Sequence, residues 1–229
     1  MKLKSIIYLK PKGAIIICNN EFIRDYLEKQ GFIFNEKTLE YTKKTPEFKY
    51  VIGHRCSRCN MTGEIIQFGI YDYFESLSFK KWLNNKFPNE RKFNSGLIRG
   101  IQSPYAEKQD ERFRSSSATF NYSLLDYDIK EQFDEILRNY QEYVIPTFNY
   151  FKSFKEIIDC CIEFDEIGHV IEENIVQKIL YSLYAGQINQ IDQLKIDIKE
   201  KYDINPVFKE KILNRLQDII DFKYYTRKN

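Results

Sequence analysis

The sequence predicts an α+β protein: an antiparallel sheet with helices on one face, followed by a helical C-terminal region. Apolar and polar residues alternate in a hairpin at residues 47–73 and again at residues 118–124. From Asp126 onward the apolar residues recur with the helical period of 3.6 instead of two. Strands followed by helices are typical of this class. We therefore place an α+β sheet domain at residues 1–165 and a helical extension, packed on it, at residues 166–229.

The hairpin has the clearest strand pattern. The residues that share one face of its first strand are Phe48, Tyr50, Ile52, His54 and Cys56. Those that share one face of its second strand, at residues 64–70, are Ile66, Phe68 and Ile70. Residues 60–63 read Asn-Met-Thr-Gly and predict the turn between them. Because alternate side chains point to opposite faces, the pattern predicts two strands with one buried side.

The N-terminal region predicts two short strands and a helix. Apolar runs at residues 5–9 and 14–18 are separated by Lys-Pro-Lys-Gly, which is a turn signal. Asn19 or Asn20 is expected to cap a helix that ends at Gly31.

The middle of the chain predicts short elements joined by a long loop. Residues 32–43 are expected to be extended, and Ser78 is expected to cap a short helix that stops before Pro88. Residues 89–115 are polar, basic and poorly periodic, which predicts a loop. The strand at residues 118–124 follows.

The C-terminal half predicts several helices with recognisable ends. The first apolar stripe ends at Pro146. Residues 153–156 form a capping box, Ser-Phe-Lys-Glu, at the start of the next helix. A later stripe breaks at Gly186, and Asn-Pro at residues 205–206 is expected to start the last helix.

Composition indicates a folded protein whose cysteines are reduced. Of the 229 residues, 43% are hydrophobic and 30% charged, which is typical of globular domains. No apolar run approaches the roughly 20 residues needed to cross a bilayer, and no signal peptide is recognisable. The five cysteines are odd in number and do not form a dense framework, so we expect a cytoplasmic setting.

His54, Cys56 and Cys59 form the only constellation with a chemical interpretation. Imidazole and thiolate are zinc ligands, but a structural zinc site needs four of them. The remaining cysteines are Cys18 and the adjacent pair at residues 160–161, and the second histidine is His169. We therefore interpret the three residues as a metal-free strand end. A redox pair is the weaker alternative, because such pairs lie at a helix N-terminus.

The long loop carries a basic and aromatic pattern that resembles a nucleic-acid surface. The candidate contacts are Arg91, Lys92, Arg99, Arg112 and Arg114. Acidic residues in the same segment dilute its charge, so a solvated loop is the alternative interpretation.

The second half of the chain is acidic. Residues 1–115 contain 21 Lys/Arg against 13 Asp/Glu, a net charge of +8, and residues 116–229 contain 14 against 20, a net charge of −6. An acidic cluster at a predicted helix end consists of Asp159, Glu163, Asp165 and Glu166. Such carboxylates suit a basic protein partner, and a solvated helix end is the alternative.

No residue pattern indicates catalysis. The sequence contains no Gly-x-Gly-x-x-Gly or Walker loop, no Gly-x-Ser-x-Gly elbow and no His-Glu-x-x-His. Its two histidines exclude multi-histidine metal chemistry. We therefore expect no enzyme activity, no cofactor and no catalytic residue.

Several short strings occur in an order that resembles the bacterial family called domain of unknown function 4304. They are Gly31-Phe32, Tyr41, the strand ending at Tyr71, residues 97–100, residues 143–148 and Ser153. The resemblance covers about residues 20–165. It implies a small α+β protein, encoded in some genomes beside polymorphic toxins, with an immunity role and no known catalytic residues. We therefore expect a non-catalytic bacterial immunity protein that binds a basic toxin domain. A nucleic-acid-associated defence or regulatory protein that uses the basic N-terminal half is the alternative.

Overall fold

The computed structural model describes residues 9–88, 96–109, 121–126, 128–165, 167–202 and 204–222. The chain packs into two compact units, each made of two separate stretches. Unit 1 comprises Met1–Phe74 and Tyr105–Asn149, and unit 2 comprises Glu75–Pro104 and Tyr150–Asn229. Neither unit ends at residue 165, where the sequence places a domain boundary.

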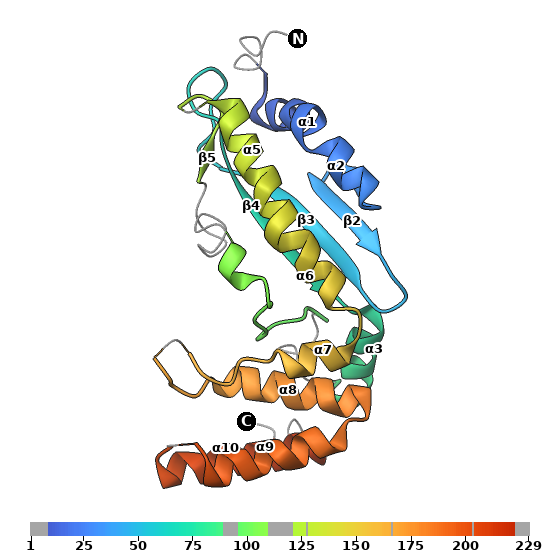
Figure 1. Ribbon diagram of the computed structural model, residues 1–229, viewed down its shortest axis with the longest axis vertical. Helices are drawn as coiled ribbons and strands as arrows, with labels where there is room; N and C mark the ends of the chain where they lie inside the picture. The colour runs from blue at the N-terminus through green and yellow to red at the C-terminus, as the bar shows by residue number, and fades with distance from the viewer. Residues whose placement is uncertain are drawn as a thin grey trace. The chain divides into compact units, whose positions relative to one another are not determined.

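The predicted α+β class is confirmed, and unit 1 contains the sheet (Figure 1). Its five strands are β1 (Ile33–Asn35), β2 (Glu40–Lys44), β3 (Lys49–Cys56), β4 (Gln67–Glu75) and β5 (Tyr122–Ser123). They are antiparallel and neighbour one another in chain order. In the register of β2 and β3, Tyr41 lies opposite Ile52 and Glu40 lies opposite Gly53. Of the strand predicted at residues 118–124, residues 118–120 lie outside the described part of the chain.

Helices cover one face of this sheet. The helical segments of unit 1 are α1 (Pro11–Phe22), α2 (Arg24–Lys29), η3 (Ala106–Lys108), α5 (Ile129–Asn139), η4 (Tyr140–Val144) and α6 (Ile145–Tyr150). Figure 1 shows α5 and α6 running across the strands. The ring of Phe68 lies 5.8 Å from that of Phe133 and 5.4 Å from that of Tyr122, and Tyr50 lies 4.9 Å from Phe148. This aromatic layer is the core of the unit.

The predicted faces of the hairpin are largely confirmed. The predicted inward residues that are buried are Phe48, Tyr50, Ile52, His54, Ile66 and Phe68. The two that are only half-buried are Cys56 and Ile70. The turn region is longer than predicted, because β4 begins at Gln67 and extends to Glu75.

The strand predicted at residues 14–18 is wrong, because this run lies in α1. Pro11 occupies the first turn, where its missing N–H costs nothing. Ala14, Ile15 and Cys18 then form a buried helical stripe, and α1 packs against α5. A short apolar run has no periodicity that separates a strand from a buried helix. The strand predicted at residues 5–9 lies outside the described residues except for its last position.

The helix start predicted at Asn19 or Asn20 consequently falls inside α1. The side-chain amide of Asn19 donates to the carbonyl of Ile15 at 3.0 Å instead of capping a helix. The predicted end is confirmed, since α2 stops at Lys29 and Gly31 has a φ of 85°. That left-handed conformation is accessible to glycine without steric cost.

The helix end predicted at Pro146 is also wrong. A regular α-helix excludes internal proline, because the ring collides with the carbonyl four residues earlier. Here the π-helical turn η4 (Tyr140–Val144) immediately precedes α6, and Pro146 lies inside α6. A wider turn displaces the carbonyl that would clash, so the helical path continues to Tyr150.

Ser76, and not the predicted Ser78, caps the helix α3 (Leu77–Lys86). The hydroxyl of Ser76 accepts a hydrogen bond from the N–H of Phe79 at 3.1 Å. Ser78 instead lies with its hydroxyl 2.9 Å from that of Ser76. The extended backbone of Ser76 is the geometry that an N-cap requires.

Three helix ends that the sequence predicts are confirmed among the other helices of unit 2. These helices are α7 (Phe154–Asp159), α8 (Glu172–Ala185), α9 (Ile188–Glu200) and α10 (Pro206–Ile220). Ser153 forms the predicted capping box at α7, and Gly186 ends α8 with a φ of 69°. Asn205 accepts from the N–H of Val207 at 3.0 Å at the start of α10. Within the described part of the chain, no helix is long and apolar enough to cross a membrane.

Candidate functional site

The structure does not assemble His54, Cys56 and Cys59 into a ligand set. His54 is 3% exposed in the core, Cys56 is half-buried, and Cys59 is exposed in the turn that follows β3. Among the described residues, no three His, Cys, Asp or Glu side chains are grouped so that they could hold a metal ion. The imidazole and the two thiols therefore have separate environments.

Burial keeps the imidazole and the nearest thiol neutral. The ring of His54 lies 6.4 Å from that of Tyr41 and 6.0 Å from that of Phe68. This desolvation lowers the pKa of His54 to about 4, and the Leu39 carbonyl opposes the shift only in part. Burial likewise raises the pKa of Cys56, although Lys12 acts in the opposite direction. A protonated thiol is a poor nucleophile and a poor metal ligand.

Of the predicted nucleic-acid contacts, only Arg99 lies in the described part of the chain. Residues Arg91, Lys92, Arg112 and Arg114 lie outside it. The backbone N–H of Arg99 donates to the Tyr181 hydroxyl at 2.9 Å, and that hydroxyl donates to the Arg99 carbonyl at 3.1 Å. The Arg99 backbone is therefore fixed on α8, while its side chain is exposed.

Two of the predicted acidic partner contacts have intramolecular roles. Glu163 forms an ion pair with Lys178 in which both side chains are largely buried. Asp165 accepts from the backbone N–H of His169 at 2.7 Å and of Ile167 at 3.1 Å, so it holds its own loop. Both carboxylates therefore already have bonding partners within unit 2.

Of the other two members of the acidic cluster, the structure describes only Asp159. Asp159 is exposed at the last position of α7. Glu166 lies outside the described residues. Because the C-terminal end of a helix disfavours negative charge, the position of Asp159 does not serve helix stability.

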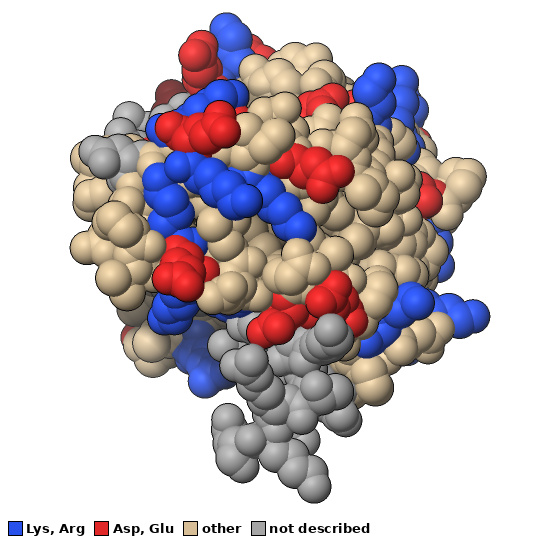
Figure 2. All heavy atoms as spheres, turned by 90° about the horizontal axis from the view of Figure 1, so that it is seen from below, with Lys and Arg blue, Asp and Glu red and all other residues tan. Residues whose placement is uncertain are grey.

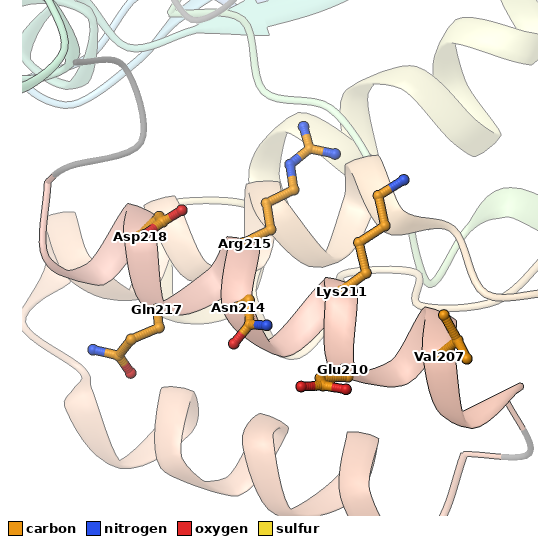
Figure 3. Close-up of a pocket in the computed structure, with 7 residues that line it drawn as sticks. All are labelled: Val207, Glu210, Lys211, Asn214, Arg215, Gln217 and Asp218. Carbon is orange, nitrogen blue, oxygen red and sulfur yellow. The ribbon is translucent and has the colours of Figure 1, made fainter. Parts of the chain in front are cut away.

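A hollow on unit 2 lies along α10 (Figure 3). Its lining residues are Val207, Glu210, Lys211, Asn214, Arg215, Gln217 and Asp218. All seven come from one helix, and the Arg215 guanidinium is paired with Glu172 of α8. Small-molecule sites are concave and enclosed by several elements. This hollow is therefore an irregular helix surface, and it provides no enclosed place for a substrate.

Positive and negative side chains both lie on the face of the molecule shown in Figure 2. Lys and Arg adjoin one another over part of this face, and Asp and Glu border them on several sides. Phosphate backbones bind to surfaces where several cations act together. Here acidic side chains stand beside the cations, so this face has a mixed charge.

The sheet face opposite the helices carries a group of aromatic and charged side chains. Because Ile52 and His54 of β3 and Phe68 of β4 point into the core, the neighbouring positions point the other way. By the register of β2 and β3, Thr42, Lys44, Lys49 and Val51 also lie on this outer face. The residues of the face that contact one another around Tyr71 are Glu40, Gly53, Arg55, Tyr71 and Tyr73. We refer to them as the tyrosine face. The alternation that predicts the core also predicts this face, but the second strand was expected to end at Ile70.

Tyr71 organises the tyrosine face. Its ring crosses β3 at Gly53, and its hydroxyl donates to the Glu40 carboxylate on β2 at 2.9 Å. The Arg55 guanidinium lies 5.7 Å above the Tyr71 ring, and the Tyr73 ring is nearly parallel to it, at 6.2 Å and 11°. Burial, followed by the bond to Glu40, raises the pKa of Tyr71. The phenol is therefore neutral and remains a hydrogen-bond donor.

Replacing Gly53 with alanine is expected to destabilise the protein by roughly 1–3 kcal/mol. A Cβ at this position would lie 2.2 Å from Cζ of Tyr71, so the ring would have to leave β3. The free energy of unfolding from urea titration measures the loss. Because Tyr71→Ser removes the obstructing ring, we expect Gly53→Ala to cost much less in the Tyr71→Ser background. An equal cost in both backgrounds would contradict the close packing of Gly53 and Tyr71.

The fold and the tyrosine face define an α+β protein with a pre-formed aromatic surface on its sheet. Comparison with family models, curated proteins and solved structures finds no match to this chain. The resemblance to domain of unknown function 4304 therefore stays an expectation from short strings. Function is consequently argued from the geometry of the described residues.

Proposed function

We propose that this protein is a non-catalytic bacterial binding protein, and that it acts as an immunity protein that neutralises a toxin by protein–protein contact. The observation that supports the proposal is the tyrosine face, in which Tyr71, Tyr73 and Arg55 lie together on the sheet. Such a protein needs a surface that is complementary to its partner and no chemistry of its own.

The side chains of the tyrosine face are those that protein interfaces use most. Tyrosine and arginine are enriched at interfaces and among the residues that dominate binding energy. Each tyrosine offers a large contact area with few rotatable bonds. Tyr71 is already held by Glu40 and Arg55, so a partner would not have to order it. Pre-organisation of this kind increases affinity by lowering the entropy cost of binding.

Nucleic acid suits the tyrosine face less well. An exposed aromatic sheet can stack bases, but the phosphates must be neutralised by nearby cations. Within the tyrosine face the one cation, Arg55, lies over the Tyr71 ring, and the Glu40 carboxylate is bonded to the same tyrosine, so the two charges offset one another. The alternative function, a nucleic-acid-associated defence or regulatory protein, therefore depends on the basic residues of the long loop.

The acidic cluster supplies a second possible contact for a basic toxin domain. Asp159 is exposed at the end of α7 and is not needed there for helix stability. Carboxylates opposite a basic partner act mainly on the association rate and make it sensitive to salt. We therefore treat Asp159 as a steering residue and the tyrosine face as the source of affinity.

The test begins by sequencing the genes that flank this one. A toxin encoded there is then co-expressed with this protein, and growth of the host cells is scored; a flanking toxin that the parent chain does not neutralise would contradict the proposal. We expect the parent chain to restore growth, and we expect Tyr73→Ala and Arg55→Ala to fail. Each variant should weaken the measured Kd at least tenfold, which corresponds to about 1.4 kcal/mol. Tyr105→Ala, which removes a partly exposed tyrosine outside the sheet, is the matched control and should restore growth. Urea unfolding of each variant separates lost binding from lost folding.

Two further results are decisive: the first would contradict the role of the tyrosine face, and the second would contradict the immunity function. If Tyr73→Ala and Arg55→Ala both restored growth while Asp159→Lys did not, the contact would belong to the acidic cluster. If the protein bound mixed DNA or RNA with sub-micromolar affinity in a gel shift, and Arg112→Glu and Arg114→Glu weakened that binding, the nucleic-acid function would replace the immunity function.

A further inference from the structure

Four aromatic rings of unit 2 gather where α3 meets the end of α10. They are Trp82, Phe87, Tyr184 and Phe222, and we refer to them as the C-terminal aromatic cluster. Trp82 lies edge-on to the other three, with ring centres 6.1 Å from Phe87, 5.7 Å from Tyr184 and 6.3 Å from Phe222. Trp82 and Tyr184 are half-buried, and Phe222 is 38% exposed. The cluster therefore reaches the surface.

A cation already lies on this cluster. The ammonium nitrogen of Lys86, the last residue of α3, is 4.8 Å from the centre of the Phe222 ring. The face of an aromatic ring carries negative charge density and attracts cations within about 6 Å. The Phe222 ring thus already makes a cation–π contact within the chain.

The backbone of Phe222 is held in an uncommon conformation. Its φ of 54° lies in the left-handed region, which residues with a side chain seldom adopt. Phe222 directly follows Asp221, the C-cap of α10, and helices often end with a left-handed residue at this position. At this helix end the Phe222 ring lies against the rings of Trp82 and Phe87 and against the Lys86 ammonium.

We propose that the C-terminal aromatic cluster is a binding site for an organic ammonium ion, which displaces Lys86 from the Phe222 ring. Lys86 is exposed, and a single cation–π contact at an exposed site is weak. Holding a lysine in one geometry also costs side-chain entropy. A quaternary ammonium ion has no such tether, and its methyl groups contact apolar rings. The inference concerns unit 2 and does not depend on the tyrosine face.

Trp82 makes the site observable, because it is the only tryptophan in the chain. Titration of the full chain with tetramethylammonium chloride is expected to change the Trp82 emission with saturation at millimolar concentrations. Sodium chloride at equal ionic strength should not produce this change. Lys86→Ala should tighten binding several-fold by removing the competing ammonium, and Phe222→Leu should weaken it at least fivefold. Lys80→Ala, on the same helix, is the matched control.

Short peptides distinguish a free ammonium ion from a partner's side chain. A trimethyl-lysine peptide that binds tighter than tetramethylammonium would assign the site to a modified lysine of a partner protein. A peptide that binds no better would assign it to a small ammonium ion. Thermal unfolding of Phe222→Leu shows whether this variant still folds. If it does not, the tighter binding expected of Lys86→Ala still tests the proposal.

An emission change that is linear and equal to that in sodium chloride would overturn the proposal. So would a Lys86→Ala variant that binds tetramethylammonium no more tightly than the parent, because Lys86 would then not occupy the site.

Discussion

Replacing Phe68 with alanine is expected to lower the free energy of unfolding by about 3–5 kcal/mol. The Phe68 side chain is fully buried, and its ring contacts the rings of Tyr122, Phe133 and His54. Truncation would remove this apolar area and leave a cavity between the sheet and α5. Urea unfolding followed by circular dichroism measures the change.

The matched control is Ile33→Ala, on the edge strand of the same sheet. Ile33 is 74% exposed, so its truncation should change stability by less than about 0.5 kcal/mol. Ile66→Asp provides a second core test, because it buries a charge at a fully buried position. If Phe68→Ala and Ile66→Asp unfolded at the same urea concentration as the parent, the assignment of the core face would be wrong.

His54→Leu is expected to change how stability depends on pH. Below its ordinary pKa of 6.5, a histidine in the unfolded chain takes up a proton, whereas the buried His54 resists protonation down to about pH 4. The stability that His54 contributes is therefore fully present above pH 6.5 and is lost as the pH falls to about 4. The loss amounts to about 3 kcal/mol over that window. The leucine variant should not show it.

Asp72 should act with the opposite sign. It lies in the core-facing row of β4, and burial raises its pKa from 3.8 to about 6. Its contribution is present below pH 3.8 and is lost as the pH rises to about 6. Because the side chain is only half-buried, water screens it and the effect should be smaller than that of His54.

The two groups therefore oppose one another between pH 4 and 6, and single variants separate them. The free energy of unfolding of His54→Leu, relative to the parent, should rise as the pH falls through this range. That of Asp72→Asn should fall. Urea midpoints at pH 4, 5, 6 and 7 measure both slopes. If His54→Leu and the parent had parallel pH profiles, His54 would not be buried and neutral.

The sequence predicts the hairpin and several helix ends because local interactions decide them. Alternation assigns faces along a strand, so the sequence pattern alone places His54 and Phe68 on the buried side. A side chain that bonds its own backbone also acts locally, which is why the caps at Ser153 and Asn205 were predicted. Gly186 likewise ends α8 by its own conformational freedom.

The structure departs from the sequence-based predictions where packing overrides the local signal. Residues 14–18 were assigned to a strand because a short apolar run suits either element, and contact with α5 makes it a helix. Pro146 was assigned to a helix end because the rule for proline assumes regular geometry. The π-helical turn before it relieves the clash, and nothing at Pro146 itself predicts that turn.

The candidate sites show the same division between what the local sequence determines and what packing decides. The sequence by itself determined the α+β class, the buried face of the hairpin and the residue types available for binding, since these follow from periodicity and composition. Only the tertiary structure decided which side chains meet. Glu163 is paired with Lys178, fifteen residues along the chain, and Tyr71 reaches Glu40 across Gly53. Phe222 meets Lys86 because α10 returns to α3. Such contacts join residues that are distant in sequence, and the free energy that selects them comes from the packing of whole elements rather than from any local pattern.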